Sequence, residues 1–294
     1  MSTILTWNVA GRVRDVAAQA RVLADRPADV LALQEIRATA AAAWEAELAR
    51  LGFAHVALTL PADTPRRPAD RRLGVLVASR APLTVCPPLD LPWPERHLAA
   101  RTVLSDGTAV EVHSLHAPLS NKPDRIKVRT LETVHAHLAA PAPIPRVLAG
   151  DLNTPRYESR EGEVQTFART RTGNLRPDFD ERHDRAELLL LTGLAEHGYA
   201  DAFRTVHGYA RRDRSWLYPN GKMGYRLDHL IVRGLSATAC EYEHGWRDDR
   251  LSDHAALWAD LAPATPGRAG ALPAPLVRRG RERRGLPDHA RRAP

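Results

Sequence analysis

Short apolar runs and amphipathic stretches alternate at the start of the chain. Ser2–Asn8 is an apolar, strand-like run, and the i, i+3, i+4 spacing of apolar positions from Val13 to Ala24 predicts an amphipathic helix. The run Asp29–Gln34 predicts a buried strand, and the Ala-rich stretch Ala38–Leu51 predicts a second helix. The pattern therefore begins as strand, helix, strand, helix.

The rest of the chain is predicted to be rich in strands. Strand-like runs occur at Leu73–Ser79, Leu83–Cys86, Ala100–Leu104, Ala109–Leu115, Arg146–Gly150, Tyr225–Val232, Ala237–His244 and Ala255–Leu261. Helices are predicted at Asp124–Leu138 and Ala186–Ala195, and loops at 61–72 and 154–184, where polar residues break the periodicity. Hairpin-like spacing with interspersed helices favours a layered α/β fold with mixed sheets over a parallel βαβ repeat.

The positive charge of the chain is concentrated at its C-terminal end. The formal net charge is +7, and residues 263–294 carry eight arginines against two acids, or +6, which leaves +1 for residues 1–262. We therefore expect one folded domain over 1–262, followed by a disordered basic tail rich in Pro, Gly and Arg over 263–294. Such a tail either attracts nucleic acid or serves solubility alone.

The number of cysteines indicates which cellular compartment to expect for the protein. Cys86 and Cys240 are too few for a disulfide framework or a cysteine-based zinc site, so we expect a reducing cytoplasm. The longest purely aliphatic run, Leu188 to Leu191, is far too short to span a bilayer, so no membrane span is expected. No signal peptide is recognised before the first strand. We also expect the protein to be a monomer.

Polar side chains gather at the ends of the predicted strands. They are Asn8, Glu35, His116, Asp151, Asn153, Asp228, Asp253 and His254. Each alone is more often a turn, a cap or a solvated group, but loops at strand ends also bring catalytic groups together over a rigid scaffold. Four carboxylates, two amides and two histidines suit a hard cation such as Mg²⁺ or Mn²⁺, which prefers oxygen ligands, better than zinc.

Five ordered segments resemble the motifs of the endonuclease/exonuclease/phosphatase superfamily. They are LTWNVAG, RPADVLALQEIR, VLAGDLNTP, GYRLDHLIVRG and LSDHAALWADL. The resemblance covers residues 2–262, with interruptions at 60–72 and 154–184. It implies a four-layered α/β sandwich, in which two mixed β-sheets pack face to face with helices outside. It also implies an active site at one end of the sandwich that hydrolyses phosphoesters with a divalent metal.

The segments LLTGLAEHGYADAFRTVHG and SWLYPNGKMGYRLDHLIV are similar to exonuclease III and the abasic-site endonucleases. In that branch, residues matching Trp216, Tyr225 and Leu227 help to line the pocket for a flipped-out abasic sugar, so DNA is the expected partner. One position departs from the branch, which has Tyr where this chain has His116, two residues before Pro118. A His at this position resembles the pancreatic-DNase-like and phosphatase-like branches.

Hydrolysis at phosphorus requires an activated water, neutralised charge on the phosphoryl oxygens and help for the leaving oxygen. We assign Glu35 as the principal metal ligand and Asp253 as a second carboxylate near the metal. Asn8 would orient the phosphate or a metal-bound water. Asp151 would position and deprotonate the attacking water, and Asn153, in an extended turn, would hold that water or a phosphate oxygen.

Two histidines complete the expected site. His254 would donate to the phosphoryl oxygen as negative charge builds there, and the resemblance pairs it with Asp228, whose carboxylate raises the pKa of an imidazole. His116 either stabilises or protonates the leaving oxygen or is a hydrogen-bonded structural histidine. His229 and His113 are expected to face the opposite sides of their strands.

The sequence leaves two other functions open. A hydrolase of the same superfamily could act on a lipid, an inositol phosphate or another small phosphoester, and the near-neutral charge of residues 1–262 and His116 favour that substrate class. A catalytically inactive scaffold that binds nucleic acid is the third alternative.

Overall fold

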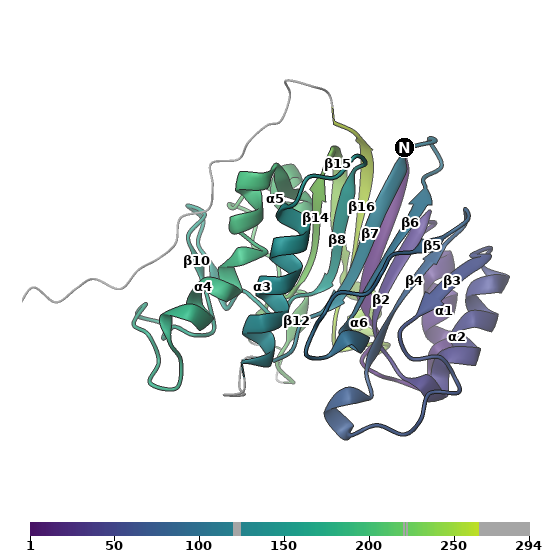
Figure 1. Cartoon of the computed structure of the whole chain (residues 1–294), viewed down its shortest axis with the longest axis horizontal. Coiled ribbons are helices and arrows are strands. Elements are labelled where there is room, and N and C mark those ends of the chain that lie inside the picture. The colour runs from purple at the N-terminus through teal and green to yellow at the C-terminus, as the bar shows by residue number, and fades with distance from the viewer. Residues whose placement is uncertain (120–124, 220, 222, 265–294) are drawn as a thin grey trace, which may run out of the picture.

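Two six-stranded sheets form the centre of the computed structural model, which describes residues 1–119, 125–219, 221 and 223–264 (Figure 1). The first sheet runs in the order β15 (Leu235–Glu243), β16 (Ala256–Pro263), β1 (Ser2–Asn8), β2 (Val30–Ile36), β4 (Gly74–Ser79) and β3 (His55–Leu58). The second runs in the order β11 (Tyr199–Asp201), β14 (Asp228–Arg233), β8 (Arg146–Asp151), β7 (Ala109–His116), β6 (His97–Val103) and β5 (Thr84–Val85).

Both sheets are mixed. Strands β1 and β2 pair in parallel in the first sheet, as do β7 and β8 in the second, while the other pairings are antiparallel. Two short ribbons lie outside the sheets: β9 (Tyr157–Glu158) with β10 (Val164–Gln165), and β12 (Trp216–Leu217) with β13 (Gly224–Tyr225).

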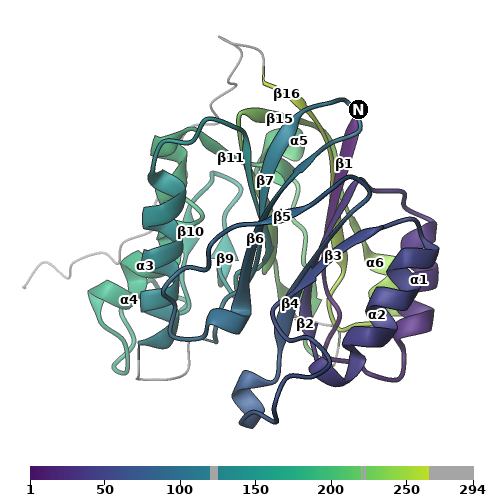
Figure 2. The same cartoon turned by 45° about the vertical axis from the view of Figure 1, so that its right-hand side comes forward.

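Helices cover the outer face of each sheet. Helices α1 (Val16–Ala24) and α2 (Ala38–Arg50) pack on the first sheet, and α3 (Ile126–Ala139) and α4 (Glu181–Leu189) pack on the second (Figure 2). The shorter helices are α5 (Ala202–His207), which contacts β14 and β15, and α6 (His244–Asp248), with 3₁₀ turns η1 (Ala69–Arg71), η2 (Pro94–Arg96) and η3 (Gly193–His197). The expected four-layered α/β sandwich is confirmed.

Because side chains alternate along each strand, some apolar residues pack between the two sheets and others pack between a sheet and its outer helices. Along β1, Ile4 packs between the sheets, whereas Leu5 and Trp7 pack outward with Trp44 of α2. Because successive strand side chains point to opposite faces, each strand that is buried on both sides needs apolar residues at both parities. Trp7 is fully buried in the outer core between the first sheet and its helices.

Residues 154–184 are not one continuous loop. They contain the β9–β10 ribbon and the first turn of α4, which begins at Glu181 and ends at Leu189 instead of the predicted Ala186–Ala195. The carboxylate of Asp180 accepts the backbone N–H of His183 and so caps the helix start, which the apolar periodicity did not reveal.

Several short elements have no counterpart among the predictions: β3, β11, β12, α5 and α6. Each has six residues or fewer, too few for a period to be recognised, and the predicted strand Tyr225–Val232 is divided between β13 and β14. The predicted disordered tail, 263–294, starts too early by one residue, because β16 runs to Pro263, and its residues 265–294 lie outside the described residues. Within the part of the chain that is described, no helix has the length and apolarity to cross a membrane.

Candidate active site

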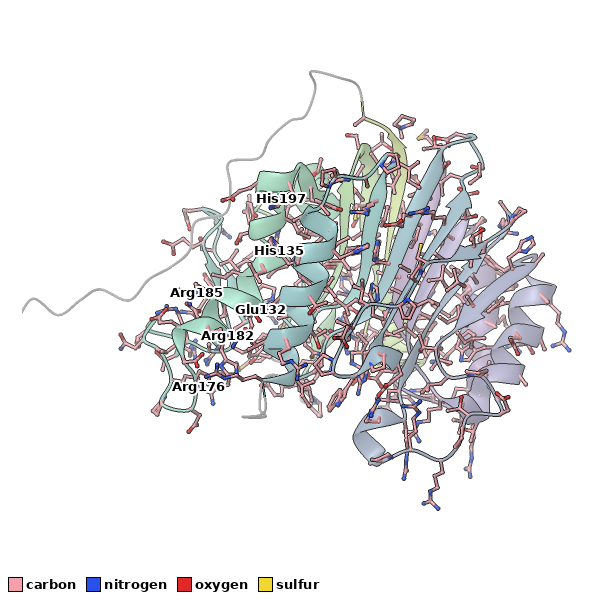
Figure 3. All side chains as sticks on the ribbon, in the orientation of Figure 1. Glu132, His135, Arg176, Arg182, Arg185 and His197 are labelled. Carbon is pink, nitrogen blue, oxygen red and sulfur yellow. The ribbon has the colours of Figure 1, made fainter. Side chains whose placement is uncertain are left out.

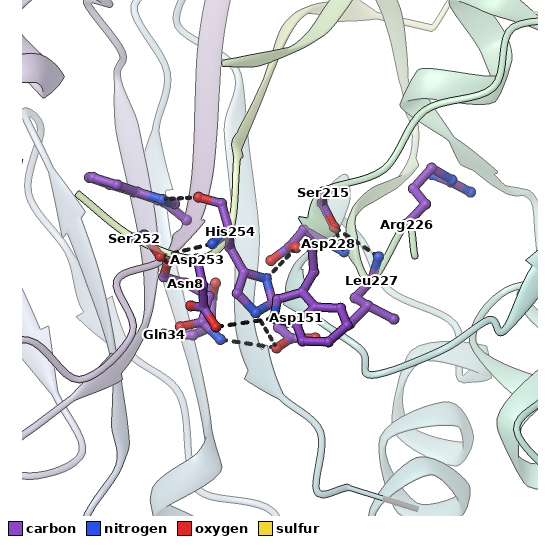
Figure 4. Close-up of polar contacts among 12 residues, drawn as sticks. Asn8, Gln34, Asp151, Ser215, Arg226, Leu227, Asp228, Ser252, Asp253 and His254 are labelled. Carbon is purple, nitrogen blue, oxygen red and sulfur yellow. Dashed lines mark hydrogen bonds and ion pairs between the residues drawn. The ribbon is translucent and has the colours of Figure 1, made fainter. Parts of the chain in front are cut away.

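Four of the expected site residues occupy inward-facing positions at one end of the central strands, and Figure 4 labels three of them, Asn8, Asp151 and Asp228. Asp151 shares the parity of Val147 and Ala149, which pack between the sheets. It lies directly opposite His116 of β7 and Asp228 of β14 in the sheet register. Strand alternation alone therefore brings these three side chains to one place. Asn8 ends β1 with the parity of Ile4 in the facing sheet.

Glu35 reaches the site through an irregularity in β2. The preceding Gln34 points inward, where its Nε2 donates to Ser114 Oγ of the second sheet at 3.1 Å, so regular alternation would turn Glu35 outward. The pairing register of β2 shifts between Gln34 and Ile36, and Glu35 has a φ of 63°. This bulge redirects the Glu35 carboxylate toward the end of β1, a use of bulges that is common beside active sites.

Asn8 joins the carboxylates contributed by the two sheets. Its Nδ2 donates to Glu35 Oε1 at 3.1 Å and to Asp151 Oδ2 at 3.0 Å. Its own Oδ1 accepts the N–H of Ala10, and its carbonyl accepts Ser252 Oγ at 2.6 Å (Figure 4). Asn8 is fully buried, so it fixes the spacing of Glu35 and Asp151 from behind the site.

His254 and Asp228 form a buried pair. His254 Nδ1 donates to Asp228 Oδ2 at 2.7 Å, and His254 Nε2 lies 3.8 Å from Asp151 Oδ2. Burial favours the neutral ring, but the carboxylates of Asp228 and Asp151 raise the pKa of His254 to about 10. The backbone N–H groups of Leu227 and Asp228 both donate to Ser215 Oγ, which holds this turn in place. His254 is therefore an oriented cation at neutral pH.

We expect the imidazole of His254 in the metal-free protein to stay protonated from about pH 6 to 9, because its carboxylate partners favour the cation. Replacing Asp228 by Asn removes the stronger of these partners and should lower the pKa of His254 substantially. Nuclear magnetic resonance titration of the His254 ring would measure its pKa in the wild-type protein and in the Asp228→Asn variant. A wild-type ring that titrates near its ordinary value of 6.5 would contradict the pairing.

Asp151 is suited to accept a proton. Burial raises its pKa to about 7, against the opposing charge of His254. Its Oδ1 accepts the backbone N–H of Asn153 at 2.9 Å. Burial also raises the pKa of Glu35, against the hydrogen bond from Asn8. A base whose pKa lies near the working pH combines a useful ionised fraction with proton affinity.

Asn153 does not occupy the expected extended turn. Its φ is 50°, a left-handed conformation that asparagine tolerates, and its Nδ2 donates to the carbonyl of Ala117 at 2.8 Å. Its carbonyl in turn accepts Lys127 Nζ at 2.8 Å. Asn153 thus ties the turn after β8 to β7 and α3, while its side chain still lines the pocket described next.

A pocket of about 560 Å³ opens over these groups. Among the expected site residues it is lined by Glu35, His116, Asp151, Asn153, Trp216, Tyr225, Leu227, Asp253 and His254. Asn8 and Asp228 are fully buried behind it. Trp216 and Tyr225 form an aromatic wall with parallel rings 6.0 Å apart, and Trp216 Nε1 donates to Asp253 Oδ2 at 3.0 Å.

Sequence patterns did not reveal Arg96, Trp93 or Phe167, which also line the pocket. Arg96 Nη1 lies 2.6 Å from His116 Nδ1, and burial together with this guanidinium holds the pKa of His116 well below its ordinary value. His116 is therefore neutral. Arg96 immediately precedes β6, whose predicted start at Ala100 was three residues too late, so no strand-end signal marked it.

The donor set at the mouth of the pocket fits a hard divalent cation. Glu35 Oε1 accepts from Asn8, but no hydrogen bond within the described residues ends on Glu35 Oε2, and the side chain is 22% exposed toward the pocket. Asp151 and Asp253 contribute further carboxylates to the same pocket, whereas Asp228 and His254, which lie near Asp151, form an ion pair with each other and are not assigned as ligands. Carboxylate oxygens beside open solvent are what Mg²⁺ uses when it keeps several waters.

A second group of possible ligands, Glu111, His113 and His137, is better explained as an ion-pair cluster. Glu111 accepts hydrogen bonds from Arg146 Nε at 2.8 Å and from Arg101 Nε at 2.9 Å. The hydrogen bond with His113 and these guanidinium groups hold the pKa of Glu111 well below its usual range. A cation would have to displace two arginines there.

The fold and the site together define a metal-dependent phosphoester hydrolase, and sequence comparison gives the family. The profile of the Endonuclease/Exonuclease/phosphatase family matches residues 5–254, so the chain belongs to that family, whose members hydrolyse phosphoesters with divalent metals. No curated protein matches the chain.

Several solved structures share the fold. An endonuclease/exonuclease/phosphatase from Beutenbergia cavernae DSM 12333 is 20% identical with a TM-score of 0.62, covering 90% of this chain and 72% of that one. An AP endonuclease from Archaeoglobus fulgidus is 22% identical with a TM-score of 0.60, covering 88% and 99%. The 3′ phosphatase NExo from Neisseria, bound to a product DNA hairpin, is 23% identical with a TM-score of 0.59, covering 89% and 100%.

Proposed function

We propose that this protein is a Mg²⁺- or Mn²⁺-dependent phosphodiesterase that cleaves DNA, in the manner of exonuclease III and the abasic-site endonucleases. One observation carries the proposal. The aromatic wall of Trp216 and Tyr225 lines the same pocket as His254 and Asp151, and Asp228 holds His254 from behind that pocket. A flipped-out nucleotide or abasic sugar needs an apolar wall next to the groups that act on its phosphate. The AP endonuclease and the DNA-bound 3′ phosphatase among the similar folds support this substrate class.

The residues of the chain divide the reaction between them. Asp151 accepts the proton of the attacking water, since its pKa of about 7 keeps a proton acceptor present at neutral pH. The cationic His254, held through Nδ1 by Asp228, directs Nε2 toward the phosphoryl oxygen that gains charge. Glu35, with Asp151 and Asp253 nearby, would hold the divalent cation, which polarises the phosphoryl group.

His116 serves the leaving oxygen as a neutral donor. Arg96 Nη1 lies 2.6 Å from Nδ1 and 3.1 Å from Nε2, so we assign the closer Nδ1 as its acceptor and the ring proton to Nε2. Nε2 lies 3.7 Å from Glu35 Oε1 and 3.8 Å from Asp151 Oδ2. With its pKa well below the ordinary value, the ring offers a hydrogen bond and not a full acidic proton. Asn8 and Asn153 keep the two carboxylates and their turn in register.

The second candidate is a hydrolase of a lipid, an inositol phosphate or another small phosphoester. The observation in its favour is the placement of His116, where the resembling DNA-repair branch has Tyr. A substrate panel discriminates the two: an abasic duplex, an undamaged duplex and a 3′-phosphorylated end against a phospholipid and inositol phosphates. We expect the DNA substrates to have the higher kcat/KM. If the small phosphoesters are hydrolysed and the DNA substrates stay uncleaved, the assignment of DNA as the substrate is wrong. The assignment of the protein as a phosphoester hydrolase would be unaffected.

We further propose that the enzyme acts in the cytoplasm as a monomer, in keeping with two cysteines that form no disulfide with each other. The residues beyond the catalytic domain are proposed to aid DNA binding. Strand β16 runs to Pro263, and the N–H of Ala264 donates to the carbonyl of Gly234 at 3.1 Å, so a truncation that spares the domain begins at residue 265.

Removing residues 265–294 should leave the hydrolysis of a small diester unchanged and weaken DNA binding. The deleted segment carries all of the +6 charge, and each phosphate it neutralises contributes about 0.9 to the dependence of log K on log salt concentration. Fluorescence anisotropy with a duplex at several salt concentrations measures the slope. An unchanged slope would show that these residues do not contact DNA.

A further inference from the structure

Two more hollows adjoin the catalytic pocket at Tyr225, one of the two rings of its aromatic wall. One has a volume of about 490 Å³ and the other about 430 Å³. Tyr225 lines both of them as well as the catalytic pocket, and Phe167 lines the catalytic pocket and the smaller hollow. Since Arg156 and Arg171 line both hollows, the two form one continuous depression that starts at Tyr225. We call it the arginine groove.

The groove is strongly basic. Its larger part is lined by six arginines, Arg156, Arg171, Arg204, Arg212, Arg214 and Arg226. Two acids face them there, Glu158 and Asp213, and the smaller part adds Arg176 without any acid. Residues 1–262 as a whole carry a formal charge of only +1, so this concentration of one sign is local. A hollow lined by like charges attracts anions of the opposite sign.

Two of these arginines are already neutralised. Arg204 and Arg226 both donate to the carboxylate of Glu158, at distances from 2.6 to 3.2 Å, and Arg226 also donates to Asp201 at 2.9 Å. All four side chains are largely buried, and the guanidinium groups hold the pKa of Glu158 at about 2 despite its burial. This buried network forms the floor of the groove.

Three other arginines keep their charge available at the rim. Arg156 donates to the carbonyl of Arg169 at 2.6 Å and Arg212 to the carbonyl of Glu158 at 3.1 Å, while Arg171 is exposed. None of the three pairs with a carboxylate of the described residues. Bonds to carbonyls orient a guanidinium without cancelling its charge, so the remaining N–H groups are prepared for an oxyanion.

We propose that the arginine groove binds backbone phosphates of a nucleic-acid strand that continues from the scissile phosphate past Tyr225. This inference rests on the proposed function, because it requires a polynucleotide substrate. Exposed aromatic rings beside the arginines, Tyr157 at 39% and Tyr218 at 39% exposure, provide surfaces on which bases stack. Arg212 already lies 4.8 Å over the ring of Tyr157. Guanidinium groups and aromatic rings that line one depression suit a strand of phosphates and bases.

The test compares two charge-matched double variants. Arg156→Gln with Arg171→Gln removes two cations from the groove. Arg182→Gln with Arg185→Gln removes two cations from the exposed face of α4 (Figure 3), where Arg182 pairs with Glu132 at 2.7 Å. The single variant Arg171→Gln controls for a folding defect, because the Arg171 side chain makes no hydrogen bond or ion pair within the described residues. Each protein is assayed with bis-p-nitrophenyl phosphate and with a single-stranded oligonucleotide, and oligonucleotide binding is measured separately by anisotropy in EDTA.

The groove variant should hydrolyse the small diester at the wild-type rate. Its oligonucleotide affinity should fall about tenfold or more at low salt, and the slope of log K against log salt should fall by about 1.4, or 0.7 per phosphate contact. Arg171→Gln should show about half of that change in slope. The α4 control should retain the wild-type affinity and slope.

These measurements distinguish an error in the groove proposal from an error in the proposed function. If the wild-type protein cleaves the oligonucleotide but the groove and α4 variants bind it alike, the groove is not the phosphate site. If the wild-type protein binds the oligonucleotide through the groove but cleaves neither it nor an abasic duplex, the nuclease assignment is wrong and the groove stands as a nucleic-acid-binding site. If the protein neither binds the oligonucleotide nor cleaves it or the abasic duplex, both proposals are overturned.

Discussion

Asp228→Asn and His254→Ala should each slow the hydrolysis of a small diester about 100- to 1,000-fold, which is about 2.7–4 kcal/mol of transition-state stabilisation. The phosphoryl oxygens gain charge in the transition state, and His254 meets that charge only while it is both protonated and oriented. Asp228 supplies both conditions through one hydrogen bond of 2.7 Å to Nδ1. Without Asp228, the buried ring loses the partner that most strongly favours its charged form.

The double variant of Asp228 and His254 should be little slower than either single variant, because the two side chains act as a unit. Adding Asp151→Asn to either should cost more again, since Asp151 acts on the side of the attacking water. Rates for the singles and doubles on one diester at fixed Mg²⁺ give the coupling directly. Simple additivity between Asp228 and His254 would return both residues to a structural role.

Glu35→Gln should reduce metal-dependent hydrolysis about 1,000-fold or more, because the cation contributes several kcal/mol of charge stabilisation. The fold should survive: the amide can still pair with Asn8, and the side chain is partly exposed. Glu47→Gln, on the outer surface of α2, provides a matched control that removes an equal charge far from the pocket. The measurement is the rate as a function of Mg²⁺ concentration, with circular dichroism to verify folding. Wild-type activity at saturating Mg²⁺ would refute Glu35 as the main ligand.

Strand periodicity and strand ends were sufficient to predict most of the catalytic centre. Asn8, His116, Asp151 and Asp228 end or begin strands with inward parity, and the sheet register then places them together without further information. The position of Glu35 could be guessed from its strand end, but its direction could not. It depends on a positive φ and a bulge that alternation alone would not produce.

Residues that reach the site through long-range contacts were beyond the sequence patterns. Arg96 is important because it packs against His116, twenty residues later in the chain. Phe167 lies in the pocket because its N–H donates to Glu187 Oε2, whose other oxygen pairs with the buried Lys127. A pattern with a period of two or 3.6 residues contains no information about such pairings, and the polar segment 154–184 consists largely of them.

The central claim is that this site hydrolyses phosphodiesters with a divalent metal. The most direct measurement is the hydrolysis of bis-p-nitrophenyl phosphate by purified protein after treatment with EDTA, before and after Mg²⁺ or Mn²⁺ is restored, with Asp151→Asn in parallel. We expect activity that EDTA abolishes, that the added metal restores, and that the variant lacks in both states. Hydrolysis that persists in EDTA, or that Asp151→Asn retains, would contradict the mechanism derived from this site.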